Sequence, residues 1–215
     1  QSSDNAFSFL MQCIVQLPDY LERLQNGHKD VPIILLPLIN ELRSLRNESE
    51  LGEESVYGAA TQLSIPEQAF NLSSSANSNL DFSELALQFQ AGLLAWFNNQ
   101  EDLQAAKNLA VCCSQIGSKN QDDSSRKVFW VASVLLQAVA NGQLKLSNAL
   151  RNSIVKIDKE VDYINNRIVG EVRKSSPARL TQELLYFVAQ NYKSSDDLRQ
   201  VYEVFELEHN IPNAS

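Results

Sequence analysis

The chain has 215 residues, among them only 7 Gly and 6 Pro, whereas ordinary proteins hold roughly 7% Gly and 5% Pro. This scarcity argues against a turn-rich β-sandwich or barrel. Three Cys are too few for a disulfide-dense scaffold, and the longest apolar run, Val31 to Ile39, is about half of a membrane span. The net charge of −8 argues against nucleic acid and against anionic membrane surfaces, because phosphates would be repelled. Composition therefore predicts a soluble, intracellular, mostly helical protein that does not insert into a membrane.

Apolar residues recur with a period near 3.6 in the N-terminal region, which predicts a helix from about Asp4 to Asn26. Its apolar face holds Leu10, Cys13, Ile14, Leu17, Leu21 and Leu24. Pro18 predicts a kink or a break into two helices in line. Asp30 is expected to cap the next helix, with Pro32 in its first turn. Residues 33–36 are apolar on every side, which predicts deep burial, and Pro37 is expected to divide this segment.

Residues 47–80 interrupt the helical pattern and predict a flexible linker with short helical pieces, one of them around Glu53 to Leu63. The tract from Ser73 to Asn79 is rich in Ser and Asn and is expected to be disordered. A group of four acidic residues precedes this tract: Glu48, Glu50, Glu53 and Glu54. These four residues are interpreted as a disordered patch or as a patch that steers a basic partner.

Helices resume at about Phe82, and six more are predicted between there and the C-terminus. The longest runs from Ser147 to about Val172, where apolar residues alternate gaps of four and three from Leu150 to Ile168. Gly27, Gly117 and Gly142 are expected to end helices, and Pro177 to begin one. The predicted fold is all-α, with about eight helices in a multi-helix bundle and no sheet. Residues 1–46 form a helical pair, 47–80 the linker and 81–212 the main bundle, which is expected to pack with 1–46 into one compact domain.

The two histidines are the first candidates for chemistry, since phosphotransfer by His uses helical bundles. His28 lies in a predicted loop and His209 in the final turn, whereas a phosphoacceptor must be exposed in mid-helix. A solvated surface side chain is the simpler interpretation of each.

The cysteines are the second candidates. Cys112 and Cys113 are adjacent within a predicted helix and Cys13 is distant in sequence, unlike the paired ligands of a zinc site. They are interpreted as buried small apolar side chains. A Gly-rich phosphate loop is absent from the sequence.

Carboxylates gather on the helix that begins near Ser147, where Asp158, Glu160 and Asp162 alternate with Lys156 and Lys159. Lys156 and Glu160 are spaced as an i,i+4 ion pair, and the cluster is interpreted as a solvated face. The residues alone therefore name no catalytic, phosphorylation, metal or cofactor site, and binding residues remain open.

Two segments carry a family resemblance: Leu10 to Arg23 (LMQCIVQLPDYLER) and Asp30 to Arg43 (DVPIILLPLINELR). They closely resemble the N-terminal region of the chemotaxis-type hybrid histidine kinases of type IV pilus systems (the PilL/ChpA type) and of stand-alone FimL-type scaffolds. Pro18, Pro32 and Pro37 are the most specific positions. Weaker likeness extends through Val139–Gly142, Lys156–Lys159 and Glu183–Ala189.

The resemblance implies the second FimL-type domain, a non-catalytic helical scaffold of two-component signalling and phosphorelay in twitching motility. It implies a location in the cytoplasm, at the cell pole, and response regulators and polar hub proteins as partners. The phosphoacceptor motif His-x-x-Lys-Gly has no match, so the kinase activity of the parent does not carry over to any residue. Two alternatives stay open: a phosphotransfer module with an atypical acceptor, and a ligand-sensing domain with a pocket near Trp96 and Trp130.

Overall fold

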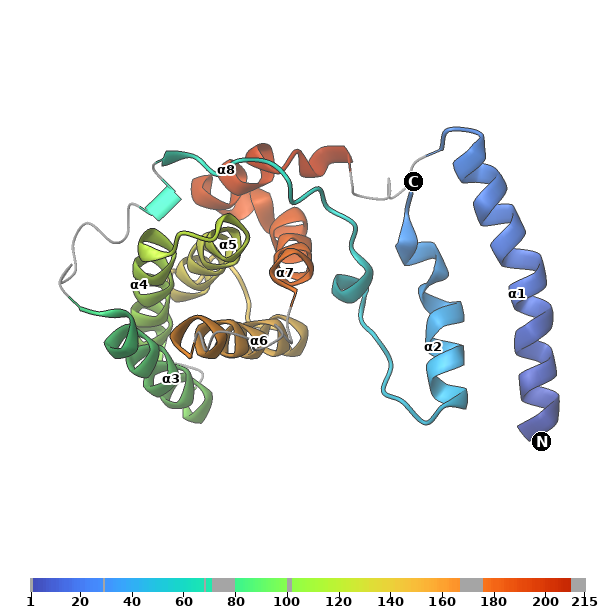
Figure 1. The fold of residues 1–215 in the computed structure, drawn as a ribbon, viewed down its shortest axis with the longest axis horizontal. Helices are drawn as coiled ribbons and strands as arrows, with labels where there is room; N and C mark the ends of the chain where they lie inside the picture. Colours follow the sequence, from blue (N-terminus) through green and yellow to red (C-terminus); the bar gives the residue numbers. More distant parts are fainter. Residues whose placement is uncertain are drawn as a thin grey trace. The chain divides into compact units, whose positions relative to one another are not determined.

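The fold consists of eight α-helices, α1 to α8, with short 3-10 turns and no strand, as far as the described residues extend (Figure 1). A computed structural model describes residues 2–28, 30–67, 69–70, 80–99, 102–166 and 176–209. The chain forms two compact units. Unit 1 contains residues 1–58 with 212–215, and unit 2 contains residues 59–211. The prediction of an all-α fold with about eight helices is confirmed.

Unit 1 is built on a pair of helices, α1 (Ser2–Gln25) and α2 (Leu36–Leu45). Figure 1 shows them side by side and antiparallel. The 3-10 turn η1 (Pro32–Leu35) leads into α2, and η2 (Glu53–Val56) follows it. Helix α1 continues through Pro18 as one element. Pro37 lies in the first turn of α2, so the predicted division of this segment falls between η1 and α2.

Asp30 does not cap the second helical segment, which corrects the sequence prediction. The N-cap of η1 is Val31, which makes no side-chain capping bond. The carboxylate of Asp30 instead accepts a hydrogen bond from the hydroxyl of Tyr20 on α1. Burial and the neighbouring Asp30 raise the pKa of Tyr20 to about 12. Asp30 therefore ties the end of α1 to the start of η1.

The predicted deep burial of residues 33–36 is also wrong. Ile34 is half exposed, and of the residues in α2 only Leu38 is classed as buried. Unit 1 is too thin a layer to cover an element that is apolar on every side, because a two-helix pair can bury only one stripe of each helix.

The predicted linker holds specific contacts where the structure describes it. The side-chain amide of Asn40 donates to the carbonyl of Leu51 at 3.0 Å and accepts from its N–H at 2.8 Å. The helical piece expected from Glu53 to Leu63 is shorter, since η2 ends at Val56. The tract from Ser73 to Asn79 lies outside the described residues. The division into 1–46, 47–80 and 81–212 stays a prediction.

Over the residues that the structure describes, unit 2 is a bundle of six helices, in which α5 packs against α4, α6, α7 and α8. The bounds are α3 Phe82–Asn98, α4 Leu103–Lys119, α5 Asp123–Ala140, α6 Asn148–Asn165, α7 Pro177–Asn191 and α8 Asp196–Val204, with the 3-10 turns η4 Tyr192–Ser194 and η5 Leu207–His209. Helix α3 packs on α4 and α6. The predicted continuation of α6 to Val172, with Ile168, lies outside the described residues.

Helix α5 forms the centre of the core. It is buried on almost every side from Ser125 to Leu136, as expected for a helix surrounded by others. Trp130 lies against Phe205, with ring centroids 5.9 Å apart. The apolar stripe of α6 is fully buried from Leu150 to Val161, as its spacing predicts.

The six helices of unit 2 begin at Asp or Ser residues whose side-chain oxygens accept a backbone N–H of the first turn. These N-caps are Asp81, Asp102, Asp122, Ser147, Ser176 and Ser195. Asp81 and Glu84 form a reciprocal capping box. Such caps satisfy the otherwise unpaired N–H groups at helix starts, so the chain itself sets where each helix begins.

Gly27 and Gly142 follow helix ends with φ of +80° and +69°, as predicted for helix C-termini. Gly117 does not end a helix, which corrects the prediction. It lies inside α4, where a Cβ would come within 2.2 Å of Cε1 of Phe70. The residue is Gly because the Phe70 ring lies against the backbone of α4, which the local sequence does not reveal.

Candidate functional site

Neither histidine lies in the middle of a helix. His28 is exposed in the loop after α1, where its backbone N–H donates to the carbonyl of Arg23 at 3.0 Å. Lys29, next to it, lies outside the described residues. His209 is the last residue of η5. A phosphoacceptor needs an exposed mid-helix position, and the structure places neither histidine in one.

Cys112 and Cys113 are buried in α4, as predicted. The thiol of Cys112 donates to the carbonyl of Leu85 at 3.3 Å. Burial raises the pKa of Cys112 to about 12, and burial together with the neighbouring Cys112 raises the pKa of Cys113 well above its usual value. Because the thiolate is the nucleophile and the metal ligand, both thiols are inert in the native state. Within the described ranges, no three His, Cys, Asp or Glu side chains gather closely enough to hold a metal ion.

The carboxylates of α6 are not a uniformly solvated face, which corrects the sequence interpretation. Glu160 is fully buried. The hydroxyl of Ser125 on α5 lies 2.7 Å from a carboxylate oxygen of Glu160 and 2.7 Å from one of Asp122. Asp158 is half-buried, and its burial, followed by the nearby charge of Asp162, raises its pKa. The hydroxyl of Ser125 thus joins the start of α5 to Glu160 on α6.

Lys156 does not pair with Glu160 along its own helix. Its Nζ lies 2.6 Å from Oε2 of Glu183 on α7, whose side chain is only 7% exposed. A charge buried to this extent needs a partner, so the contact between α6 and α7 outweighs the weak i,i+4 pairing.

The acidic group before the Ser/Asn tract is partly neutralised within unit 1. Glu48 lies 3.0 Å from Arg43 and 3.0 Å from Arg46. The pairing of Glu48 with two Arg side chains reduces the negative charge available to steer a basic partner.

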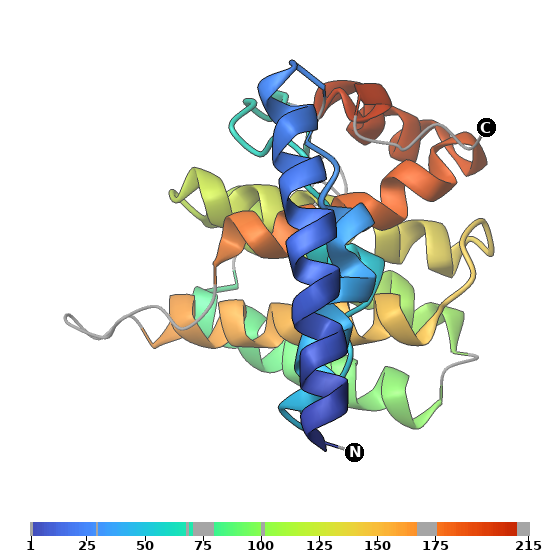
Figure 2. The same ribbon diagram turned by 90° about the vertical axis from the view of Figure 1, so that its right-hand side faces the viewer.

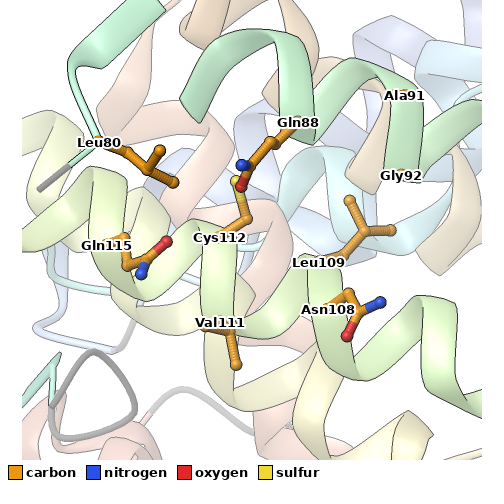
Figure 3. Close-up of a pocket in the computed structure, with 9 residues that line it drawn as sticks. All are labelled: Leu80, Gln88, Ala91, Gly92, Asn108, Leu109, Val111, Cys112 and Gln115. Carbon is orange, nitrogen blue, oxygen red and sulfur yellow. The ribbon is translucent and has the colours of Figure 1, made fainter. Parts of the chain in front are cut away.

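The strongest candidate for binding is the face formed by α3 and α4. A groove of about 520 Å³ runs between them, with Gln88, Ala91 and Gly92 on the α3 side and mainly α4 residues opposite (Figure 3). The remaining lining residues are Leu80, Asn108, Leu109, Val111, Cys112 and Gln115. In Figure 3 the side chain of Gln88 points from α3 toward α4. The lining is apolar side chains and neutral amides, which suits recognition rather than proton transfer.

Two large apolar side chains stand on α3 next to this groove. Leu87 is 67% exposed and Leu94 is 65% exposed. They are seven residues apart, so they project from one side of the helix two turns apart, with exposed Ala91 between them. The core side chains of α3, Leu85 and Phe89 among them, lie on the opposite side. Exposed leucines beside a groove mark a protein contact surface more often than isolated ones do.

Charge is sparse on this face. Helix α3 carries one charged residue, Glu84, and α4 carries two, Lys107 and Lys119. Charged residues are depleted from the centres of protein interfaces because their desolvation is costly. We name Leu87, Leu94 and the groove between α3 and α4 the α3–α4 face. The residues that line its groove carry apolar side chains and neutral amides.

The pocket expected near the tryptophans is not this groove. Trp96 and Trp130 are both buried in the core of unit 2, and neither lines the space between α3 and α4. The sequence analysis missed the α3–α4 face. The signal that marks it in the sequence is the seven-residue spacing of Leu87 and Leu94, on the side of α3 opposite the buried Leu85 and Phe89.

None of the helices in the described part of the chain combines the length and hydropathy needed to cross a bilayer.

Comparison with known proteins places most of the chain in one family. The sequence profile described as the FimL scaffold protein second domain matches residues 75–215, which include all the helices of unit 2. The scaffold protein FimL of Pseudomonas aeruginosa is 23% identical over 209 residues, covering 96% of this chain and 36% of the relative. The chain thus spans about a third of that relative's length. No solved structure matches it.

Proposed function

The chain belongs to the FimL scaffold family, and on this premise we propose that it is a non-catalytic scaffold region of a chemotaxis-like signalling kinase that controls type IV pili and twitching motility. The similar protein from Pseudomonas aeruginosa bears the name scaffold protein. The observation that carries the proposal is the α3–α4 face, which offers two exposed leucines and a groove in the family-matched part of the chain. Its lining fits a protein surface better than a reacting substrate.

The partners we propose are response regulators and polar hub proteins of the same signalling system. A scaffold works by holding such proteins together, which needs exposed apolar anchors rimmed by polar groups. Leu87 and Leu94 supply the anchors, and Gln88, Asn108 and Gln115 supply neutral hydrogen-bonding groups. The corresponding location is the cytoplasm, at the cell pole.

Within this region we assign docking to the main bundle, residues 81–212. The helical pair of residues 1–46 takes no part in this docking, whereas Leu80, at the end of the linker of residues 47–80, lines the groove. Deleting residues 1–46 is therefore expected to leave binding through the α3–α4 face intact.

The test is capture of purified response regulators and polar hub proteins by the chain and by two variants. Replacing Leu87 and Leu94 together with Ser is expected to weaken binding at least about ten-fold, since each buried leucine contributes about 1.5–3 kcal/mol. Leu103→Ser is the matched control, because Leu103 is 50% exposed on α4 and does not line the groove. Equal binding by the double variant and the control would show that the α3–α4 face is not the docking site.

A second assay separates scaffolding from phosphotransfer. The chain is incubated with the cognate kinase domain and ATP, and acid-labile phosphate is sought by mass spectrometry. We expect none on His28 or His209. Stoichiometric phosphate on either histidine would refute the scaffold proposal.

A further inference from the structure

Helix α1 in unit 1 presents an apolar face that α2 does not cover. The side chains of Phe7, Leu10, Ile14, Leu17 and Leu21 are between 39% and 67% exposed. Of the residues of α1 that are buried or half-buried, Phe9 and Gln12 lie on the other side of the helix, Cys13 and Tyr20 flank the exposed face, and Leu24 lies at its end. In Figure 2, α1 stands in front of α2, so its uncovered side faces the viewer. An apolar face of this extent is uncommon on a monomer and marks an interaction surface.

The spacing of this face is that of a helix–helix seam. Phe7, Leu10, Ile14, Leu17, Leu21 and Leu24 follow one another by alternating gaps of three and four. They therefore occupy six consecutive a and d positions of a heptad repeat, the pattern by which helices pack knobs into holes. We name these six residues the α1 seam.

The α1 seam is complementary to itself in the antiparallel direction. Turning a second copy about a two-fold axis between Val15 and Gln16 places Phe7 opposite Leu24, Leu10 opposite Leu21, and Ile14 opposite Leu17. In every layer an a position meets a d position. Antiparallel packing also sets the two helix dipoles in opposite directions, which is electrostatically favourable. A two-fold contact of this kind uses the same patch on both copies.

The charges of α1 fit self-association. Between Phe7 and Leu24 the charged residues, Asp19, Glu22 and Arg23, occupy positions away from the seam, and the residues that flank the seam there include Met11, Cys13 and Tyr20. Charged residues at the flanking positions usually select a different partner. Without charged residues at the flanking positions, two copies do not repel each other there, and no pattern of charges favours a helix of a different protein.

From these observations we propose that two copies of the chain pair through their α1 seams as an antiparallel two-helix contact. The seam is about 26 Å long and one helix wide, well below the ~800 Å² per partner of a standard stable interface. The dimer is accordingly reversible, with a dissociation constant in the micromolar range. Pairing would present two α3–α4 faces in one assembly.

The test is sedimentation velocity of the full 215-residue chain across the micromolar range, with two single variants. Ile14→Ser removes a seam residue that is 65% exposed. Val15→Ser removes a neighbour that is 67% exposed and lies off the seam. The wild-type chain is expected to shift from monomer to dimer with concentration. Ile14→Ser should raise the dissociation constant at least about ten-fold and Val15→Ser less than about two-fold. Circular dichroism checks that both variants keep their helices.

Spin labels distinguish the direction of pairing. Single labels at Gln16→Cys and Gln25→Cys are introduced in a Cys13→Ser background. Antiparallel pairing predicts a short distance between the two labels at 16 and an axial separation of about 28 Å between those at 25. Short distances at both sites would overturn the antiparallel arrangement. A chain that stays monomeric throughout, or equal effects of the two Ser variants, would overturn the proposal, and the α1 seam would then be assigned to another part of the chain or to a different protein.

Discussion

Gly117→Ala is expected to destabilise unit 2, although the substitution improves the helix in which it lies. Ala is favoured over Gly in a helix interior by about 1 kcal/mol. The new Cβ would, however, lie 2.2 Å from Cε1 and 2.7 Å from Cζ of Phe70, and 3.0 Å from Cβ of Phe129. Phe129 belongs to the core helix α5, so Phe70 is the side chain that moves.

The magnitude follows from what Phe70 loses. Its side chain is 8% exposed, and the guanidinium of Arg126 lies 5.6 Å from the ring centroid. Exposing a buried Phe costs about 1.5–3 kcal/mol. Subtracting the gain in helix propensity leaves a net destabilisation of about 0.5–2 kcal/mol. In a Phe70→Ala background the clash is gone, so the same substitution should be neutral or stabilise by up to about 1 kcal/mol.

Urea unfolding of the four variants of this double-mutant cycle, followed by the fluorescence of the two buried tryptophans, measures the coupling. Gly92→Ala is the matched control, because its Cβ would meet only the flexible side chain of Leu109, at 3.1 Å. The reasoning is refuted if Gly117→Ala has the same effect with and without Phe70, or if the control is equally destabilising.

Other predictions concern ionisable groups. Thiol titration of the native chain at pH 8 should detect Cys13 alone, because a pKa of about 12 leaves Cys112 roughly one part in 10,000 ionised. Detection of all three before unfolding would contradict this. Lys156→Met should lower the free energy of unfolding by about 1–3 kcal/mol, since Glu183 stays buried without its partner. An unchanged urea midpoint would contradict it. Asp158 has a raised pKa in the folded state, so its contribution to stability falls as pH rises from the usual carboxyl range through that pKa. Asp158→Asn should therefore raise the free energy of unfolding at pH 7, and the gain should vanish at low pH. A gain of equal size at both pH values would point to a non-electrostatic cause.

Much of the local structure could be predicted from the sequence. Ser147 and the residues after it predict where α6 begins, and Pro177 predicts the start of α7, because caps and prolines act over a few residues. The absence of a His-x-x-Lys-Gly motif could likewise be read directly from the sequence.

The sequence predictions that the structure corrects have a common physical origin. Asp30 has the chemistry of a helix cap but bonds to Tyr20. Gly117 resembles a helix end but lies under Phe70, and Glu160 resembles a surface charge but is buried beside Ser125. In each case a contact made by another segment determines the role of the residue, and such contacts leave no mark in the local pattern.

Helices α1 and α6 show most clearly which features follow from the sequence pattern and which depend on tertiary contacts. Both carry apolar residues at alternating gaps of three and four, and this spacing alone was enough to predict two amphipathic helices. The stripe of α6 is fully buried from Leu150 to Val161, whereas that of α1 remains exposed at Ile14. Periodicity determines which side of a helix is apolar, because it depends only on 3.6 residues per turn. Whether that side is covered depends on a second apolar surface within reach, and only the tertiary structure decides this.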